Sequence, residues 1–192
     1  AAKGLFVMDG SRRSAHGNAY FTGLGAAKRV VFFDTLLAEL TPAEVEAVLA
    51  HELGHFKHRH VLKRIAAMFG LSLAGLALLG WLASRSWFYT ALGVQPNMAA
   101  PNDALALLIF VLVLPVFGFF TAPIGSLLSR RHEFEADAYA CAQASGTDLA
   151  NALIKLHEDN AATLTPDPLY VRFYYSHPPA SERLAALKVA AA

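Results

Sequence analysis

Hydrophobic and polar positions change their spacing several times along the 192-residue chain. Alternating and β-branched apolar runs in residues 4–34 predict a small antiparallel β-sheet. Apolar residues at helical spacing, or long runs without charge, then predict a series of helices. We expect helices at 41–60, 65–84, 104–129 and 129–145, and more than one C-terminal helix within 147–190. The expected fold is mostly α with a small antiparallel β-sheet, in one domain of residues 1–192 that a helical hairpin interrupts.

The helix predicted at 41–60 has a well-marked beginning. Thr41 and Glu44 have the spacing of a capping box, and Pro42 takes the first helical position. Apolar residues then recur at helical spacing, namely Val45, Val48, Leu49, Leu53 and Phe56. We therefore expect the helix to begin at Thr41.

Two uncharged runs predict a transmembrane hairpin. Residues 65–84 carry no charge and are long enough to cross the hydrocarbon core of a bilayer. Residues 104–129 are also uncharged, and Pro115 and Pro123 predict kinks there. The composition agrees with a membrane protein, because 55% of the residues are apolar, only 16% are charged, and the mean hydropathy is +0.39. A buried helical hairpin in a soluble protein is the alternative.

The distribution of basic residues predicts how the hairpin is oriented. Lysines and arginines cluster at 57–64, before the first run, and Arg130 and Arg131 follow the second run. The segment between the two runs carries only Arg85 and Asp103 as charged residues. The positive-inside rule therefore places the helix at 41–60 on the cytosolic side.

A metal-binding motif lies within that helix. His51 and His55 are four residues apart, so both imidazoles lie on one helix face and can reach one zinc ion. Glu52 lies about 100° around the helix from His51, where its carboxylate can take a proton from metal-bound water. A chance match on a solvated amphipathic helix is the alternative.

The third ligand is expected after the hairpin, because two spans return the chain to the same side of the membrane. Glu133 and Asp137 are four apart and share a helix face. Glu133 can bind zinc, and Asp137 can accept the other N–H of a ligating histidine. An ordinary solvated face is the alternative, and His132 could compete as the ligand. His58 shares the face of His51, but its cationic neighbours favour contact with lipid headgroups.

Three further residues have open interpretations. Asn18, at the start of the second predicted strand, can hydrogen-bond an extended peptide or close a turn with Gly17. His177, at the start of the last helix, is either a cap or a site residue. Cys141, the single cysteine, excludes an internal disulfide and is interpreted as a core residue. The net charge of +1 says little about partners, but the sequence has no basic stripe interleaved with aromatic residues that would suggest a nucleic-acid partner.

Several short motifs follow one another along nearly the whole chain. They are Asp9-Gly10-Ser11 with Arg13-Ser14 and His16, Asn18-Ala19-Tyr20-Phe21, His51-Glu52-Leu53-Gly54-His55, Ser129-Arg130 with Glu133-Phe134 and Ala136-Asp137, and His177-Pro178-Pro179 with Glu182-Arg183. In this order they closely resemble one family, the type I CAAX prenyl proteases. These are integral-membrane zinc endopeptidases of the gluzincin type, related to HtpX.

The resemblance implies one Zn²⁺ ion held by His51, His55 and Glu133, with Glu52 as the catalytic base. It also implies that Asp137 orients a ligand histidine, that Asn18 holds the substrate backbone and that His177 helps to stabilise the oxyanion. Family members carry further spans before the sheet, and this chain opens at Ala1 without methionine. We therefore expect the C-terminal peptidase portion of a longer protein.

The expected activity is hydrolysis of peptide bonds by zinc-activated water. The partners implied are the lipid bilayer and a peptide or protein substrate, with prenylated C-terminal CAAX sequences as one class. The membrane would be the bacterial inner membrane, or the endoplasmic reticulum or nuclear membrane in a eukaryote. An HtpX-like protease for quality control of membrane proteins is the first alternative. A non-catalytic membrane module with a structural metal site is the second.

Overall fold

The structure is a computed structural model that describes residues 4–23, 29–97, 99–159 and 166–190. It divides into two compact units, residues 1–60 with 125–192 and residues 61–124. The single domain of residues 1–192 stays a prediction, and its two ends lie outside the described residues. Residues 160–165, within the stretch of 147–190 where C-terminal helices are predicted, also lie outside them.

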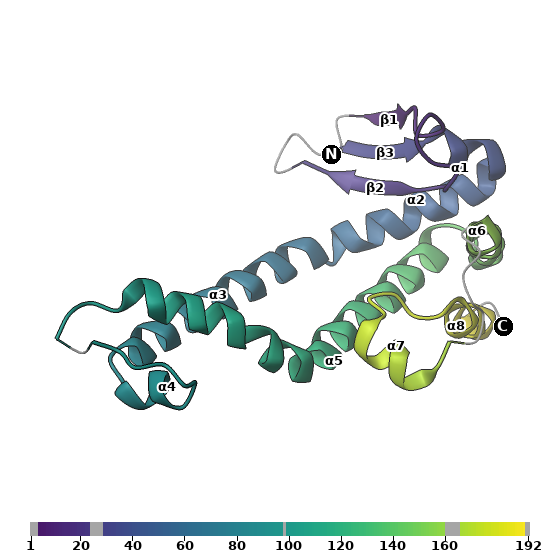
Figure 1. Ribbon diagram of the computed structural model, residues 1–192. Coiled ribbons are helices and arrows are strands. Elements are labelled where there is room, and N and C mark those ends of the chain that lie inside the picture. Colours follow the sequence, from purple (N-terminus) through teal and green to yellow (C-terminus); the bar gives the residue numbers. More distant parts are fainter. Residues whose placement is uncertain (1–3, 24–28, 98, 160–165, 191–192) are drawn as a thin grey trace. The chain divides into compact units, whose positions relative to one another are not determined.

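The sheet of the first unit has three strands: β1 (Leu5–Met8), β2 (Ala19–Thr22) and β3 (Arg29–Phe33). Their order is β1-β3-β2, with β2 antiparallel and β1 parallel to β3 (Figure 1). The sheet is therefore mixed and not wholly antiparallel as predicted. Asp34, directly after β3, accepts hydrogen bonds from the backbone N–H of Gly10 at 2.9 Å and Ser11 at 3.0 Å. These bonds hold the carboxyl ends of β1 and β3 together, which strands running in opposite directions would not allow.

Helix α1 (Asp34–Glu39) follows the sheet, and α2 (Pro42–Lys57) comes next. The Thr41 hydroxyl accepts from the Glu44 N–H at 3.4 Å, and the Glu44 carboxylate accepts from the Thr41 N–H at 2.7 Å. The predicted capping box is thus confirmed, with Pro42 at the first helical position. Lys155 also contacts Glu44, at 2.7 Å, which ties the start of α2 to a later helix.

Four more helices complete this unit: the last part of α5 (Asp103–Gln143), α6 (Gly146–Asp159), α7 (Pro168–Tyr174) and α8 (Ala180–Ala190). One buried cluster joins β3 to α2 and α6 through Phe32, Val48 and Ala152. A second cluster joins α2, α5 and α8 through Ala47, Ala140 and Leu187. Because α2 belongs to both clusters, the core holds it between the sheet and the C-terminal helices.

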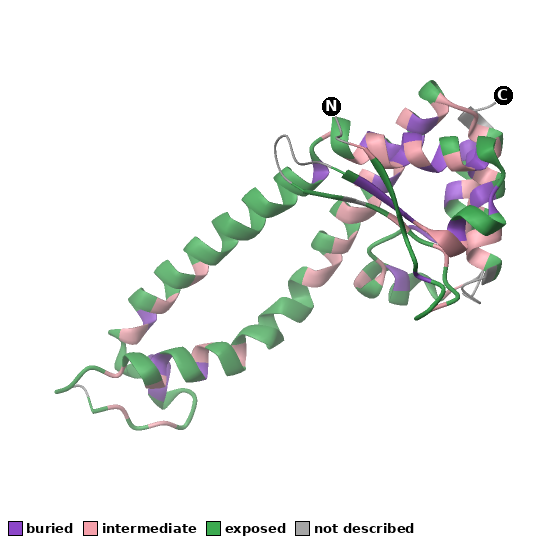
Figure 2. Ribbon diagram, turned by 90° about the horizontal axis from the view of Figure 1, so that it is seen from above, coloured by how far each residue is buried: buried purple, intermediate pink, exposed green. Residues whose placement is uncertain are grey.

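The second unit contains most of α3 (His60–Ala83), α4 (Ser86–Thr90) and the first part of α5. Both long helices are apolar and long enough to cross a membrane, yet only 6% and 11% of their most apolar stretches are buried (Figure 2). The core helix of a soluble protein would be mostly buried, so this exposure favours the transmembrane interpretation over the soluble alternative.

A small core closes the connection between the two long helices. Phe88 and Tyr89 of α4 are buried together with Leu82, Ala106 and Ile109. The Tyr89 hydroxyl donates to the carbonyl of Ala83 at 2.8 Å, so this buried phenol has a partner. Helix α5 is assigned without a break through its two prolines to Gln143. The segments predicted at 104–129 and 129–145 are therefore parts of one helix.

Replacing Thr41 by alanine should destabilise the protein by about 1 kcal/mol, because the N–H of Glu44 loses its acceptor. For a chain of this size that loss corresponds to a fall in melting temperature of about 2–4 °C, measured by thermal unfolding in detergent. Thr41→Ser keeps the hydroxyl and is the matched control. Equal melting temperatures for the alanine and serine variants would show that the cap contributes nothing.

Candidate metal centre

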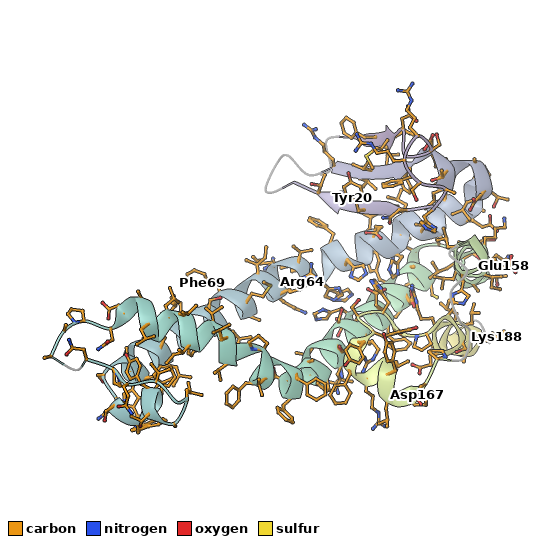
Figure 3. The ribbon with its side chains drawn as sticks, viewed as in Figure 1. Tyr20, Arg64, Phe69, Glu158, Asp167 and Lys188 are labelled. Atoms are coloured by element: carbon orange, nitrogen blue, oxygen red, sulfur yellow. The ribbon has the colours of Figure 1, made fainter. Side chains whose placement is uncertain are left out.

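Three side chains of the first unit converge between α2 and α5, where Figure 3 shows side chains of the two helices facing each other. The Nε2 atoms of His51 and His55 are 3.1 Å apart. Glu133 places Oε1 at 3.4 Å from Nε2 of His55 and Oε2 at 3.7 Å from Nε2 of His51. A tetrahedral zinc ion about 2.0–2.1 Å from each ligand atom would hold those atoms about 3.3 Å apart. The three residues therefore fit one metal ion.

The close approach of the two helices depends on Gly54. A Cβ atom at this position would lie 2.9 Å from Cα and 3.0 Å from the carbonyl oxygen of Ala136. Both of those atoms belong to the backbone of α5 and cannot rotate away. Ala136 is itself fully buried, at 0% exposure. The pair Gly54 and Ala136 thus brings the histidine pair of α2 within reach of the carboxylates of α5.

Asp137 lies one helical turn after Glu133 and contacts the outer side of His51. Its Oδ1 is 2.8 Å from Nδ1 of His51. Since a carboxylate only accepts hydrogen bonds, Nδ1 carries the proton, and the lone pair of His51 is on Nε2. This is the usual arrangement for a histidine ligand that a carboxylate orients.

Arg183 of α8 completes the buried charges. Its guanidinium donates through two nitrogens to the Asp137 carboxylate, with Nε at 2.8 Å from Oδ2. A third nitrogen lies 3.6 Å from Oε2 of Glu133. Sequence reasoning included Arg183 in a motif but assigned it no role. Two acidic residues on one face of a buried helix need a cation nearby, and this need was the signal that could have indicated such a residue. Nothing in the local sequence of α8 shows that Arg183 is the residue that reaches them.

The two carboxylates of α5 lie beyond residue 129, outside the apolar run, and both are held ionised. Burial by itself raises the pKa of Glu133, but the hydrogen bond from His177 and the charges of His177 and Arg183 hold that pKa well below its usual range. Burial also opposes ionisation of Asp137, yet its hydrogen bonds with His51 and Arg183 keep its pKa below the ordinary value. Metal ligands must be deprotonated, so this environment suits a metal site.

Glu52 and His177 also lie at this centre. Burial raises the pKa of Glu52. The nearby charge of Glu133 raises this pKa further, whereas the charges of both α2 histidines and His177 lower it. The Nδ1 atom of His177 lies 3.0 Å from Oε2 of Glu133, and this hydrogen bond raises the pKa of the histidine. His177 thus binds the side of the Glu133 carboxylate away from His55, which leaves Oε1 for a metal.

Asn18 is placed differently. It is exposed, and its carbonyl accepts the N–H of Phe33 at 2.9 Å, within the β2–β3 pairing. No contact joins it to His51, His55 or Glu133 among the residues that the structure describes. Ala19 of β2 packs against the core cluster that includes Val48, so β2 lies beside α2. Because β2 is an edge strand, its outer side could pair with an extended peptide.

The two alternative ligands, His58 and His132, lie in a second group of side chains. His58, His60 and Glu135 bring donor atoms within 4.8 Å of one another. His132 stacks on His60, with ring centroids 4.0 Å apart. The group formed by His51, His55 and Glu133 contains neither of the two alternatives.

Comparison with known proteins gives a consistent result. The pattern of Peptidase family M48 matches residues 1–191. CAAX prenyl protease 1 of Saccharomyces cerevisiae is 36% identical, over 95% of this chain and 43% of its own length. The CAAX prenyl protease 1 homolog of Homo sapiens is 34% identical, over 96% of this chain and 46% of its own length. The chain therefore spans less than half the length of these curated relatives.

A solved structure is similar over the same region. The crystal structure of S. mikatae Ste24p superposes with a TM-score of 0.83 at 37% identity. The match covers 95% of this chain and 45% of that chain. The mostly helical fold with a small sheet is thus confirmed by a relative of clear sequence similarity.

Replacing Gly54 by alanine should push α2 and α5 apart, and the expected loss of stability is about 1–3 kcal/mol. Zinc affinity, measured by competition with a chelator, should fall as well because the ligands lie on both helices. Gly70→Ala is the matched control, since a Cβ there meets nothing within 4 Å and alanine suits a helix better than glycine. Wild-type zinc affinity in the Gly54 variant would contradict the close-contact argument.

Proposed function

The chain belongs to peptidase family M48, and on this premise we propose that it carries the zinc centre of a membrane-embedded endopeptidase of the CAAX prenyl protease type. The observation that carries the proposal is the convergence of His51, His55 and Glu133 within 3.1–3.7 Å. These ligands with one open position are the donor set of a catalytic zinc site. When bound there, zinc supplies Lewis-acid chemistry that acidifies water and polarises a carbonyl group.

Glu52 is the proposed proton carrier. It lies directly before Leu53 on the helix that carries both histidines. The charges of the ligand residues influence the pKa of its carboxylate. In this role the carboxylate accepts a proton from the attacking water and passes it to the leaving amine. Half-burial of the side chain limits its contact with bulk water, which helps to keep the transferred proton within the site.

His177 and Asn18 are proposed to contact the substrate. His177 exposes 69% of its side chain while Nδ1 is held by Glu133, so the rest of the ring is accessible to a substrate. A donor there can meet the oxyanion that forms during acyl transfer, which contributes about 3–4 kcal/mol in well-studied proteases. Asn18 precedes the edge strand β2, where an amide side chain can bind a peptide backbone that extends the sheet.

The substrate class and the orientation rest on the relatives and on the charge pattern. Relatives named CAAX prenyl proteases favour a prenylated peptide over the general clients of an HtpX-like enzyme. The exposed apolar helices are suited to contact with lipid, either the bilayer or the prenyl chain of a substrate. Basic residues flanking both helices on one side support a centre that faces the cytosol.

Glu52→Gln should lower kcat/KM for peptide cleavage by about 100- to 10,000-fold, because the amide cannot accept the proton. Zinc content per chain should not change, since Glu52 is not among the ligands. The matched control is Glu46→Gln, which removes an exposed carboxylate from the same helix. Near-normal cleavage by the Glu52 variant would refute the proposed mechanism.

Two peptides that end in the same CAAX sequence, one farnesylated and one not, test the substrate class. The detergent-solubilised protein should cleave the farnesylated peptide faster, because the exposed apolar helices can hold the lipid. The Glu52→Gln variant serves as the blank. Equal cleavage of both peptides would leave the zinc chemistry intact and indicate general membrane proteolysis, the HtpX-like alternative.

A further inference from the structure

We propose that His60, held by Glu135, is a positioning residue that fixes the ring of His55 so that its Nε2 lone pair faces the metal. This inference rests on the proposed function, because it concerns a zinc ligand. Two contacts carry it: Nδ1 of His60 lies 2.9 Å from Nδ1 of His55, and Nε2 of His60 lies 2.9 Å from Oε2 of Glu135. His51 has Asp137 as its orienting partner, and these contacts assign a different kind of partner to His55.

A break in the helix brings His60 to this place. Helix α2 ends at Lys57, and the N–H of His58 bonds to the carbonyl of Gly54 at 3.0 Å. Arg59 then adopts φ 57°, a left-handed conformation that is uncommon for residues other than glycine. Helix α3 begins at His60. On an unbroken helix His60 would lie about 140° around the axis from His55, too far for the two rings to meet edge to edge.

The protons in the hydrogen bonds that join Glu135, His60 and His55 can be assigned one by one. The Glu135 carboxylate accepts only, so Nε2 of a neutral His60 carries the proton and Nδ1 carries a lone pair. Nδ1 of His55 must then donate to His60, which leaves the lone pair of His55 on Nε2. His51 also presents a lone pair on Nε2, and the two atoms are 3.1 Å apart. Two facing lone pairs repel each other unless a cation lies between them, so the arrangement is complete only as a metal site.

The surroundings of His60 hold its ring in one plane. The residue is only 4% exposed. The ring of His132 stacks on it at 4.0 Å with an interplanar angle of 11°, and the ring of His58 lies nearly parallel at 5.5 Å. These two nearly parallel rings leave the imidazole little freedom to tilt. A stiff second partner is what a metal ligand needs to keep its own orientation.

The alternative to this hydrogen-bonded arrangement is a second metal ion bound by His58, His60 and Glu135. A metal on Nε2 of His60 would move the proton of that ring to Nδ1. Two N–H groups would then face each other at 2.9 Å, between His60 and His55. The second ion would therefore oppose binding at the catalytic ligands. The hydrogen-bonded arrangement avoids this conflict, so the structure favours it.

The test compares zinc affinities of variants, measured by competition with a chelator, together with zinc content per chain. His60→Leu introduces an apolar side chain of similar size and removes the Nδ1 atom that accepts the hydrogen bond from His55. Zinc affinity should therefore fall about 10- to 100-fold. His60→Asn places its side-chain oxygen near the former Nδ1 and should restore affinity to within a few-fold of wild type. His58→Leu removes one of the rings beside His60 but leaves both hydrogen bonds of His60 in place, so it should lower zinc affinity much less than His60→Leu does.

A second pair of variants covers the case in which His60→Leu fails to fold. Glu135→Leu removes the acceptor for Nε2 of His60 and should weaken zinc binding, whereas Glu135→Gln keeps an acceptor oxygen and should not. The visible spectrum of the cobalt-loaded protein reports the ligand geometry, and it should change in the leucine variants and not in the amide variants. Melting temperatures of the metal-free variants separate this effect from a general loss of structure.

Three results would overturn the inference: wild-type zinc affinity in both leucine variants, an asparagine variant as weak as His60→Leu at equal metal-free stability, or a second zinc ion that only His58→Leu removes. These results leave the proposed function standing if the unsubstituted protein binds zinc and cleaves peptide. An unsubstituted protein that binds no zinc would refute both.

Discussion

The close contact between α2 and α5 at Gly54 and Ala136 is the constraint on which the centre depends. Every proposed ligand lies on one of these two helices, and the space between them is narrower than a single added methyl group would allow. The core places α2 for this contact, because one buried cluster joins it to the sheet and another joins it to α5, α6 and α8. Small residues at the crossing therefore serve the chemistry as much as the packing.

Such a contact brings like charges together, and the structure compensates for them. Glu133 and Asp137 are 5% and 3% exposed, and two unpaired carboxylates at that depth would cost several kcal/mol. Arg183 neutralises one charge through its paired hydrogen bonds with Asp137. The Glu133 carboxylate remains directed at the two histidines of α2, with Oε1 near His55 and Oε2 near His51. A divalent cation at His51, His55 and Glu133 would then be attracted by charge as well as by its ligands.

The two units divide the proposed work between polar chemistry and contact with lipid. The unit of residues 1–60 and 125–192 holds all the residues to which we assign a role in metal binding or catalysis. The unit of residues 61–124 consists mainly of apolar helices, and most residues in their most apolar stretches are exposed. A prenylated peptide, the substrate class that we propose, has the same two kinds of surface.

The sequence by itself determined the features that depend on neighbours within one or two helical turns. The capping box of Thr41, the histidine pair of α2 and the pairing of Glu133 with Asp137 on one face of α5 follow from helix periodicity. Only the tertiary structure decided the parallel direction of β1, the contact of Arg183 with Asp137, and the link from His55 through His60 to Glu135. Those features join segments as much as 75 positions apart, or depend on a left-handed residue at Arg59 that interrupts the periodicity. Local spacing carries no information about which distant surfaces pack together, because packing is selected by the shape and charge of the whole core.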